Sequence, residues 1–290
     1  MSTSAVVNSS WLRVGDIAPA ALVDARLQLH HAAQIAVSAA ISYLAARSDD
    51  SHTALTWLPA PRALATESIT VERDIRIGVR LEDLTLQVLG GDAPNVQPFS
   101  LQRRTITDAY SWLSEAVAVI GLDAARLNPR KHYTIPAHAV VDGAPFSSRI
   151  GNELLELARY WSNAAGLLDD TLRSTPGASP VRTWPHHFDI ATLIELPDAG
   201  IGGATARRTI GIGQSPGDNS YSEPYWYVGP FPYPSTREFP PVAGGGHWHT
   251  EGWLGAVLPA SGFVAATDQR PQVVSFIDSA VAACRTLLGG

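Results

Sequence analysis

The chain has 290 residues, of which 45% are hydrophobic and 17% are charged, a balance typical of a folded globular protein with a substantial core. Its formal net charge is −6, and its basic residues form nothing denser than doublets such as Arg103-Arg104. This pattern argues against a nucleic-acid-binding surface and against an anionic-membrane surface. The single cysteine, Cys284, excludes an internal disulfide and a cysteine-rich zinc site.

The first residues, Met1 to Ser10, lack the basic start and the apolar run of a secretory signal. No apolar stretch reaches the length of about 18 residues that a membrane span needs. We therefore expect a cytoplasmic protein with neither nucleic acid nor membrane as a partner.

The first half of the chain predicts a helix, a hairpin and a second helix. Apolar residues at helical spacing indicate a long helix over residues 20–46, and short strand-like segments follow at 53–58, 69–71, 74–81 and 84–89. The clearest strand alternates Ile75, Ile77 and Val79 with polar residues, and a turn at Glu82-Asp83 makes it one arm of a hairpin. A second helix is predicted over 105–120, with Gly121 as its C-terminal stop.

The same order recurs in the second half. A proline-rich connector over 129–146 leads to a predicted helix at 147–172, to strands and loops over 182–263 and to a closing helix at 271–288. We expect an α+β fold of two similar helix–antiparallel sheet–helix units, a pseudo-repeat. The first unit would span 1–128 and the second 147–290, and the second would carry the functional site.

Residues that could bind a metal gather late in the chain, in the stretch Gly246-His-Trp-His-Thr-Glu251. On a strand, His247, His249 and Glu251 would project from one face, and two imidazoles with one carboxylate suit zinc or iron. His186 could complete such a site. The alternative is that the flanking glycines form a loop, where the shared-face argument fails and these residues are hydrogen-bonded at a strand edge.

A second polar cluster, His186-His-Phe-Asp189, precedes an alternating strand. That alternation predicts His186 on the more apolar face and His187 beside Asp189, which would suit a general base oriented by a carboxylate. These two are the candidate catalytic residues. The alternative is an imidazole bonded to a backbone carbonyl, with Asp189 bonding turn amides.

Aromatic side chains between residues 184 and 253 could line a ligand pocket. Tyr225 and Tyr227 would share one face of a strand, and rings with a polar end suit stacking on planar or sugar ligands. Several of these rings could equally be core residues. The candidate ligand-binding residues are Trp184, Tyr225, Tyr227, Trp248 and Trp253.

Two glycine-containing motifs carry no chemistry. Gly213-Gln-Ser-Pro-Gly217 matches the pattern of a nucleophile elbow, but Pro216 lacks the N–H that such an elbow uses as an oxyanion donor. A structural turn is the better interpretation. Gly211 and Gly213 also lack the third glycine of a dinucleotide fingerprint, so we expect no nucleotide cofactor.

Several short motifs, taken in order, resemble a family of bacterial proteins of unassigned function called DUF5996. They are Ala158-Arg-Tyr-Trp161, Ser179-Pro-Val181 with Phe188-Asp-Ile-Ala191, Ser215-Pro-Gly-Asp218 leading into Pro224-Tyr-Trp-Tyr227, and Leu258-Pro259. The resemblance covers nearly the whole chain and implies no reaction. His247 and His249 depart from the family pattern, which has aromatic or small residues there.

Two functional hypotheses follow. The first is a small-molecule enzyme with a divalent metal, zinc or iron, held by His247, His249, Glu251 and His186, with Asp189 and His187 as catalytic residues. The second is a non-catalytic protein that binds a small ligand in an aromatic pocket. The sequence does not choose between hydrolysis, lyase chemistry and oxidation, and it does not indicate an oligomeric state.

Overall fold

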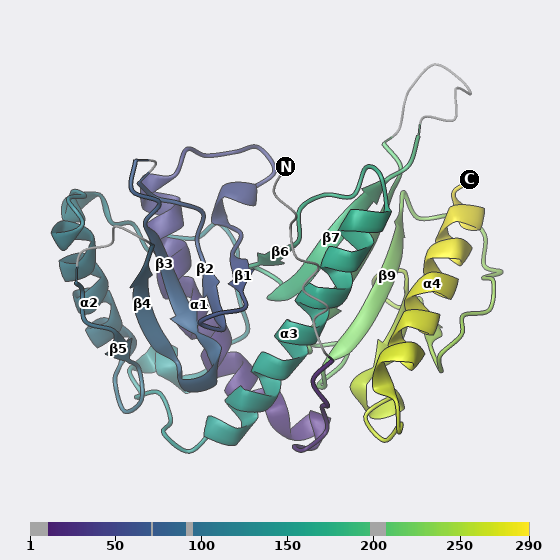
Figure 1. Cartoon of the computed structure of the whole chain (residues 1–290), viewed down its shortest axis with the longest axis horizontal. Helices are drawn as coiled ribbons and strands as arrows, with labels where there is room; N and C mark the ends of the chain where they lie inside the picture. The colour runs from purple at the N-terminus through teal and green to yellow at the C-terminus, as the bar shows by residue number, and fades with distance from the viewer. Residues whose placement is uncertain (1–10, 71, 91–94, 198–206, 290) are drawn as a thin grey trace, which may run out of the picture.

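The computed structural model describes residues 11–70, 72–90, 95–197 and 207–289. Four α-helices are present in these ranges: α1 (Val23–Tyr43), α2 (Ile106–Val119), α3 (Gly151–Ser174) and α4 (Gln269–Leu287). Each of two antiparallel sheets is preceded and followed by a helix (Figure 1). The predicted α+β class, with two helix–sheet–helix units, is confirmed.

The first sheet is a simple meander in the order β1-β2-β3-β4-β5. Its strands are β1 (Thr56–Leu58), β2 (Ala63–Ala65), β3 (Arg76–Arg80), β4 (Thr85–Leu89) and β5 (Phe99–Ser100). The predicted hairpin is β3–β4, in which Ile77 lies opposite Val88. Alternating apolar residues of β3 are buried because they face α1.

The second sheet is larger and has the order β10-β11-β9-β8-β7-β6. Its strands are β6 (Arg182–Trp184), β7 (Asp189–Glu195), β8 (Thr209–Ser215), β9 (Tyr225–Phe231), β10 (His247–His249) and β11 (Gly255–Pro259). The last strand lies inside the sheet, between β9 and β10. The two sheets therefore differ in strand order at this end.

The first strands of the two sheets meet near the middle of the molecule. The backbone N–H of Leu55 donates to the carbonyl of Thr183 at 2.9 Å, and the N–H of Thr183 donates back to the carbonyl of Leu55 at 2.8 Å. This antiparallel bridge joins the start of β1 to β6. Labels β1 and β6 are accordingly neighbours in Figure 1.

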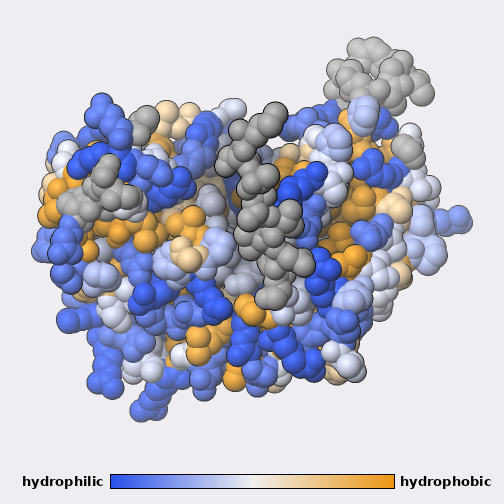
Figure 2. Space-filling model, viewed as in Figure 1, coloured by the Kyte–Doolittle hydropathy of each residue, from blue (hydrophilic) through white to orange (hydrophobic). Residues whose placement is uncertain are grey.

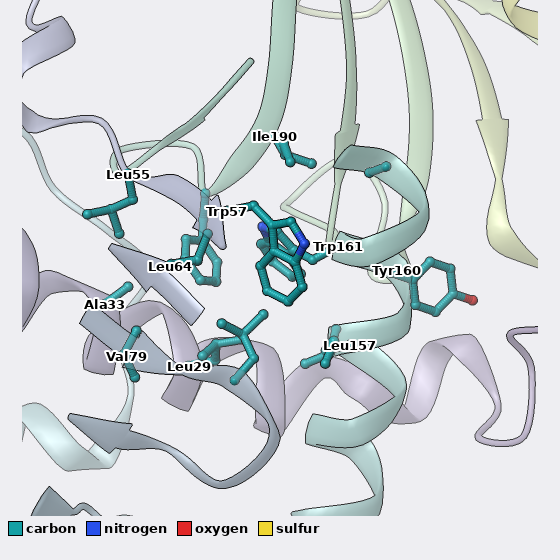
Figure 3. Packing of buried hydrophobic residues seen from close by; sticks show 14 of the residues in the cluster. Leu29, Ala33, Leu55, Trp57, Leu64, Val79, Leu157, Tyr160, Trp161 and Ile190 are labelled. Atoms are coloured by element: carbon teal, nitrogen blue, oxygen red, sulfur yellow. The ribbon is translucent and has the colours of Figure 1, made fainter. Parts of the chain in front are cut away.

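Helix α3 contributes the largest fully buried side chain at this junction. Trp161 is fully buried, and its indole N–H donates to the Thr183 hydroxyl at 3.2 Å. Figure 3 shows its ring among apolar side chains from α1, the first sheet and the second sheet; these include Leu29, Leu64 and Ile190. One core is therefore continuous across both units.

Helix α1 is almost entirely buried, although it carries many polar residues. Arg26, His30, Gln34 and Ser38 recur at intervals of four and are all buried, so they lie along one stripe of the helix. Ser38 bonds the Tyr110 hydroxyl of α2 at 2.9 Å. The rest of the stripe faces the second unit.

Several helices and strands begin or end at other residues than the sequence pattern predicts. Helix α3 begins four residues later than predicted, at Gly151, and strands β2 and β5 are too short to leave a sequence pattern. The predicted strand over 69–71 is reduced to a single bridge between Thr70 and Ile75, and its last residue, 71, lies outside the described residues. The end of α2 is as predicted, since Gly121 has a φ of +87°.

In the described part of the chain, no helix has both the length and the apolarity to span a membrane. On the face seen in Figure 2, apolar residues form separate groups among hydrophilic ones.

Replacing Trp161 tests whether the two units share one core. Trp161→Ala should lower the free energy of unfolding by about 3–5 kcal/mol, because it leaves a large cavity and an unpaired Thr183 hydroxyl. Urea unfolding followed by fluorescence and by circular dichroism measures the loss. Val119→Ala, at a residue that is 59% exposed, is the control and should change stability by less than about 0.5 kcal/mol. A loss of similar size for both variants would contradict the shared core.

Candidate functional site

The face of the second sheet opposite α3 and α4 carries most of the predicted site residues. Trp226 and Val228 of β9 are buried on the helix side, where the Cys284 thiol of α4 lies 4.0 Å from the Val228 carbonyl. Side chains alternate along a strand, so Tyr225 and Tyr227 point the other way. This confirms the prediction that Tyr225 and Tyr227 share one face of the strand.

Strand register places β7 and β8 residues beside these tyrosines. Tyr227 lies opposite Gly213, which lies opposite Ala191, so Asp189 shares their face. A Cβ on Gly213 would stand 2.5 Å from the Tyr227 hydroxyl oxygen. Glycine at this position therefore lets the phenol cross β8 and donate a hydrogen bond to Asp189 Oδ2.

A pocket of about 300 Å³ opens over this face, and we call it the aromatic pocket. Its lining residues are His187, Asp189, Ser215, Asp218, Tyr225, Tyr227 and Trp253. Five of the seven were predicted as catalytic or ligand-binding residues. The sheet thus brings together side chains that are up to 66 positions apart in sequence.

Asp189 is the most unusual group in the aromatic pocket. It is 8% exposed, and its Oδ1 atom has no hydrogen-bond partner among the described residues. Burial raises the pKa of this carboxyl above its ordinary value, while the Tyr227 hydrogen bond opposes that rise. Burial and the neighbouring carboxylate together raise the pKa of Tyr227 well above 10, so the phenol remains a donor.

Asp218, the other carboxylate in the pocket, is fully engaged. It accepts hydrogen bonds from the Tyr225 hydroxyl at 2.7 Å, from the Ser220 N–H at 2.7 Å and from the Tyr221 N–H at 3.0 Å. Burial and this carboxylate raise the pKa of Tyr225. The two aspartates therefore differ in role, because Asp218 organises a turn and Asp189 keeps an oxygen free.

His186 and His187 lie in the turn between β6 and β7, where the strand alternation used to predict their faces does not apply. The turn is closed by the Phe188 N–H, which donates to the Trp184 carbonyl at 2.7 Å, and Phe188 has a φ of +61°. The strand alternation therefore does not extend to these histidines. His187 still reaches the aromatic pocket, and burial lowers the pKa of His186.

Helix α1 holds this turn in place. The Pro185 carbonyl accepts hydrogen bonds from His30 Nε2 and from Gln34 Nε2, both at 2.8 Å. Burial lowers the pKa of His30 to about 3, so its imidazole is neutral and donates through Nε2. The His30 ring also stacks on Phe188, with 4.5 Å between ring centroids.

A second pocket, of about 270 Å³, adjoins the first, and we call it the arginine pocket. It lies where α1 meets the turn at 185–188 and the turn at 216–220. It shares His187, Asp218 and Trp253 with the aromatic pocket and adds Arg26, Leu27, His30, Pro136, His186, Phe188, Pro216, Gly217, Asn219 and Ser220. The indole N–H of Trp253 donates to Ser220 at 3.3 Å, which fixes the shared wall.

His247 and His249 share a face of β10, as predicted, and both meet one phenol. The Tyr221 hydroxyl lies 3.1 Å from His247 Nε2 and 3.1 Å from His249 Nδ1. His249 Nε2 is 2.7 Å from the carbonyl of Glu251. Glu251 itself lies beyond the end of β10, in a bend, so it does not continue the strand face.

These contacts indicate which ring nitrogen carries the hydrogen when the two imidazoles are neutral. A carbonyl only accepts, so neutral His249 carries its proton on Nε2 and its Nδ1 accepts from Tyr221. The Tyr221 oxygen then accepts from His247 Nε2. In this arrangement His249 has no free lone pair for a metal, and the described residues contain no group of three His, Cys, Asp or Glu suited to hold one.

The remaining predicted residues have different surroundings. Trp253 packs on His249, with ring centroids 4.3 Å apart. Trp248 points away from the aromatic pocket; its indole donates to the Pro240 carbonyl at 2.7 Å and stacks on Phe239. Trp184 and His186 form an edge-to-face ring pair with centroids 6.1 Å apart, and Trp184 lines neither pocket.

Sequence reasoning assigned no role to Arg26, His30 or Asp218. The four-residue spacing of Arg26, His30, Gln34 and Ser38 within an apolar helix was a usable signal, because a polar stripe on a buried helix needs partners. For Asp218 the sequence showed only that it lies in a stretch with the composition of a turn, which does not indicate a functional role.

Comparison of the chain with family models, with curated proteins and with solved structures gives no match. The resemblance to DUF5996 therefore stays a prediction that rests on the short motifs alone.

Replacing Asp189 or Asp218 by asparagine should change the free energy of unfolding in opposite directions. Asp189→Asn should raise the free energy of unfolding at neutral pH, because it removes a charge whose burial is unfavourable and keeps the acceptor for Tyr227. A carboxyl with a raised pKa in the folded state destabilises only where it is ionised, so this gain should vanish below the ordinary pKa of 3.8. Asp218→Asn should lower stability, because it disturbs three hydrogen bonds. Urea unfolding across pH measures both, and equal effects of the two variants would contradict these roles.

Tyr221→Phe tests the histidine pair. Loss of two partly exposed hydrogen bonds should lower the free energy of unfolding, measured with urea, by about 1 kcal/mol, whereas Tyr233→Phe, at a tyrosine that is 58% exposed, should have no effect.

Elemental analysis of wild type and of His247→Ala/His249→Ala tests the predicted metal. Because His247 and His249 are hydrogen-bonded to Tyr221, we expect equal metal content in both proteins. Stoichiometric zinc or iron that is present in the wild type and lost from the variant would support the predicted metal site.

Proposed function

We propose that this protein binds a small molecule in the aromatic pocket, through a hydrogen-bond-donating group that pairs with Asp189. The observation that carries the proposal is Asp189, a buried carboxyl group that lines a pocket of about 300 Å³ and whose Oδ1 has no hydrogen-bond partner among the described residues. A buried polar atom without a partner costs about 1–3 kcal/mol. A ligand donor at this position would recover that cost.

The surroundings favour a cationic amine as this donor. Asp189 and Asp218 place two carboxyl groups in the pocket, and the rings of Tyr225, Tyr227 and Trp253 surround it. Aromatic faces attract cations, and each such contact contributes about 0.5–2 kcal/mol. An ammonium group with an attached apolar body fits both features better than a neutral polar ligand does.

A second candidate is an enzyme that uses Asp189 for proton transfer. Its support is the raised pKa of Asp189, together with the Tyr227 hydroxyl and His187 at the same pocket, since groups of this kind recur in acid–base catalysis. The metal-dependent form of this hypothesis has less support, because His249 is fully hydrogen-bonded. Ligand binding is therefore the primary proposal.

Benzylamine is a suitable first probe, because it joins an ammonium group to a ring. We expect saturable binding by calorimetry or by fluorescence. Asp189→Asn should weaken binding at least about tenfold, equivalent to about 1.4 kcal/mol. Binding should also weaken as pH falls through the raised pKa of Asp189, since protonation removes the negative charge while the amine stays charged.

Two controls separate pocket binding from surface charge. Asp142→Asn makes the same change at an exposed aspartate and should leave the affinity unchanged, and benzyl alcohol should bind more weakly than benzylamine. Benzylamine binding that is absent, or that is unaffected by Asp189→Asn, would contradict the proposal.

A further inference from the structure

Arg26 is a buried cation without an anionic partner. It is 8% exposed, its Nε atom has no hydrogen-bond partner among the described residues, and it belongs to none of the ion pairs found there. Burial lowers the pKa of its guanidinium, and the negative charge of Asp218 opposes that effect. An arginine in this state costs free energy unless something else compensates its charge.

The guanidinium is held at the wall of the arginine pocket. Gly217 has a φ of +112°, and a Cβ there would stand 3.0 Å from Arg26 Nη1. Glycine thus serves both the turn and the close approach of the arginine to it. Since α1 is anchored to the neighbouring turn through His30, the position of Arg26 is set by the fold.

Asp218 acts on Arg26 through its negative charge but does not pair with it. Asp218 already accepts hydrogen bonds from Tyr225, Ser220 and Tyr221 and forms no ion pair with the arginine. The guanidinium therefore keeps donors that a ligand can use, beside the neutral ring of His30 and the side chain of Asn219.

We infer that Arg26 binds a carboxylate group, so that the ligand of this protein is a small amino-bearing carboxylic acid. This inference deepens the proposed function, because it adds the second charged group of the same ligand. The amine would lie at Asp189 and the carboxylate at Arg26, and the two pockets adjoin along Trp253, His187 and Asp218.

A carboxylate fits this pocket better than a phosphate. One arginine offers a single positive charge and a planar pair of donors that matches a carboxylate. The adjacent Asp218 would repel a dianion more strongly than a monoanion. The turn also has no row of free amides like that of a phosphate loop, because the N–H groups of Gly217, Asp218, Ser220 and Tyr221 are already bonded.

Nitrogen–proton NMR of arginine side chains tests the inference directly, because the Nε–H group belongs to the guanidinium that would bind the carboxylate. Acetate added to the full chain should shift the Arg26 Nε–H resonance in a saturable way, and chloride at the same ionic strength should not. Inorganic phosphate should bind more weakly than acetate. Assignment comes from the loss of this resonance in Arg26→Gln.

Matched variants separate this inference from the proposed function. Arg26→Gln should abolish acetate binding and retain benzylamine binding, while Asp189→Asn should weaken benzylamine and retain acetate. Arg26→Lys keeps the charge but not the planar donor pair, so it should weaken acetate binding only in part. It also serves if Arg26→Gln does not fold.

The inference would be overturned if acetate caused no saturable shift of the Arg26 resonance, or if chloride produced the same shift. Phosphate binding as tightly as acetate would overturn the assignment to a carboxylate. Saturable acetate binding without benzylamine binding would refute the amine site alone and leave the Arg26 site standing.

Discussion

The structure depends on one acceptor, the carbonyl of Pro185, which receives hydrogen bonds from two side chains of α1. A helix of the first unit thereby fixes a turn of the second. Because His30 is kept neutral by burial, this contact requires no counter-charge. The arginine pocket is therefore lined by both units, whereas the aromatic pocket is lined by the second unit alone and meets the first through the turn that α1 holds.

The helices and the β3–β4 hairpin could be predicted because their periodic burial is local. The faces of β9 and β10 followed from alternation for the same reason. The turn at His186 and His187 could not be read this way, since its geometry is set by His30 and Gln34, about 150 positions earlier in the chain. Arg26 was missed for a similar reason, because only the packing of α1 against the turn at 216–220 shows that it is buried and unpaired.

Part of the site is built at the expense of stability. Arg26 and Asp189 are both buried and both lack a full set of partners; Arg26 lines the arginine pocket and Asp189 lines the adjoining aromatic pocket. Residual strain of this kind persists where the surrounding fold over-determines it, as the Trp161 core and the Leu55–Thr183 bridge do here. By contrast, the histidine pair around Tyr221 is satisfied internally and resembles a structural network.

The Trp253 wall between the two pockets has a consequence for selectivity. A molecule that carries both charged groups pays the entropy of association once, so its affinity exceeds that of two separate fragments, as in a chelate. The gain is greatest when the spacer between the groups matches the separation of Asp189 and Arg26 and falls when it is shorter or longer. The protein would in this way measure the length of its ligand as well as its charge.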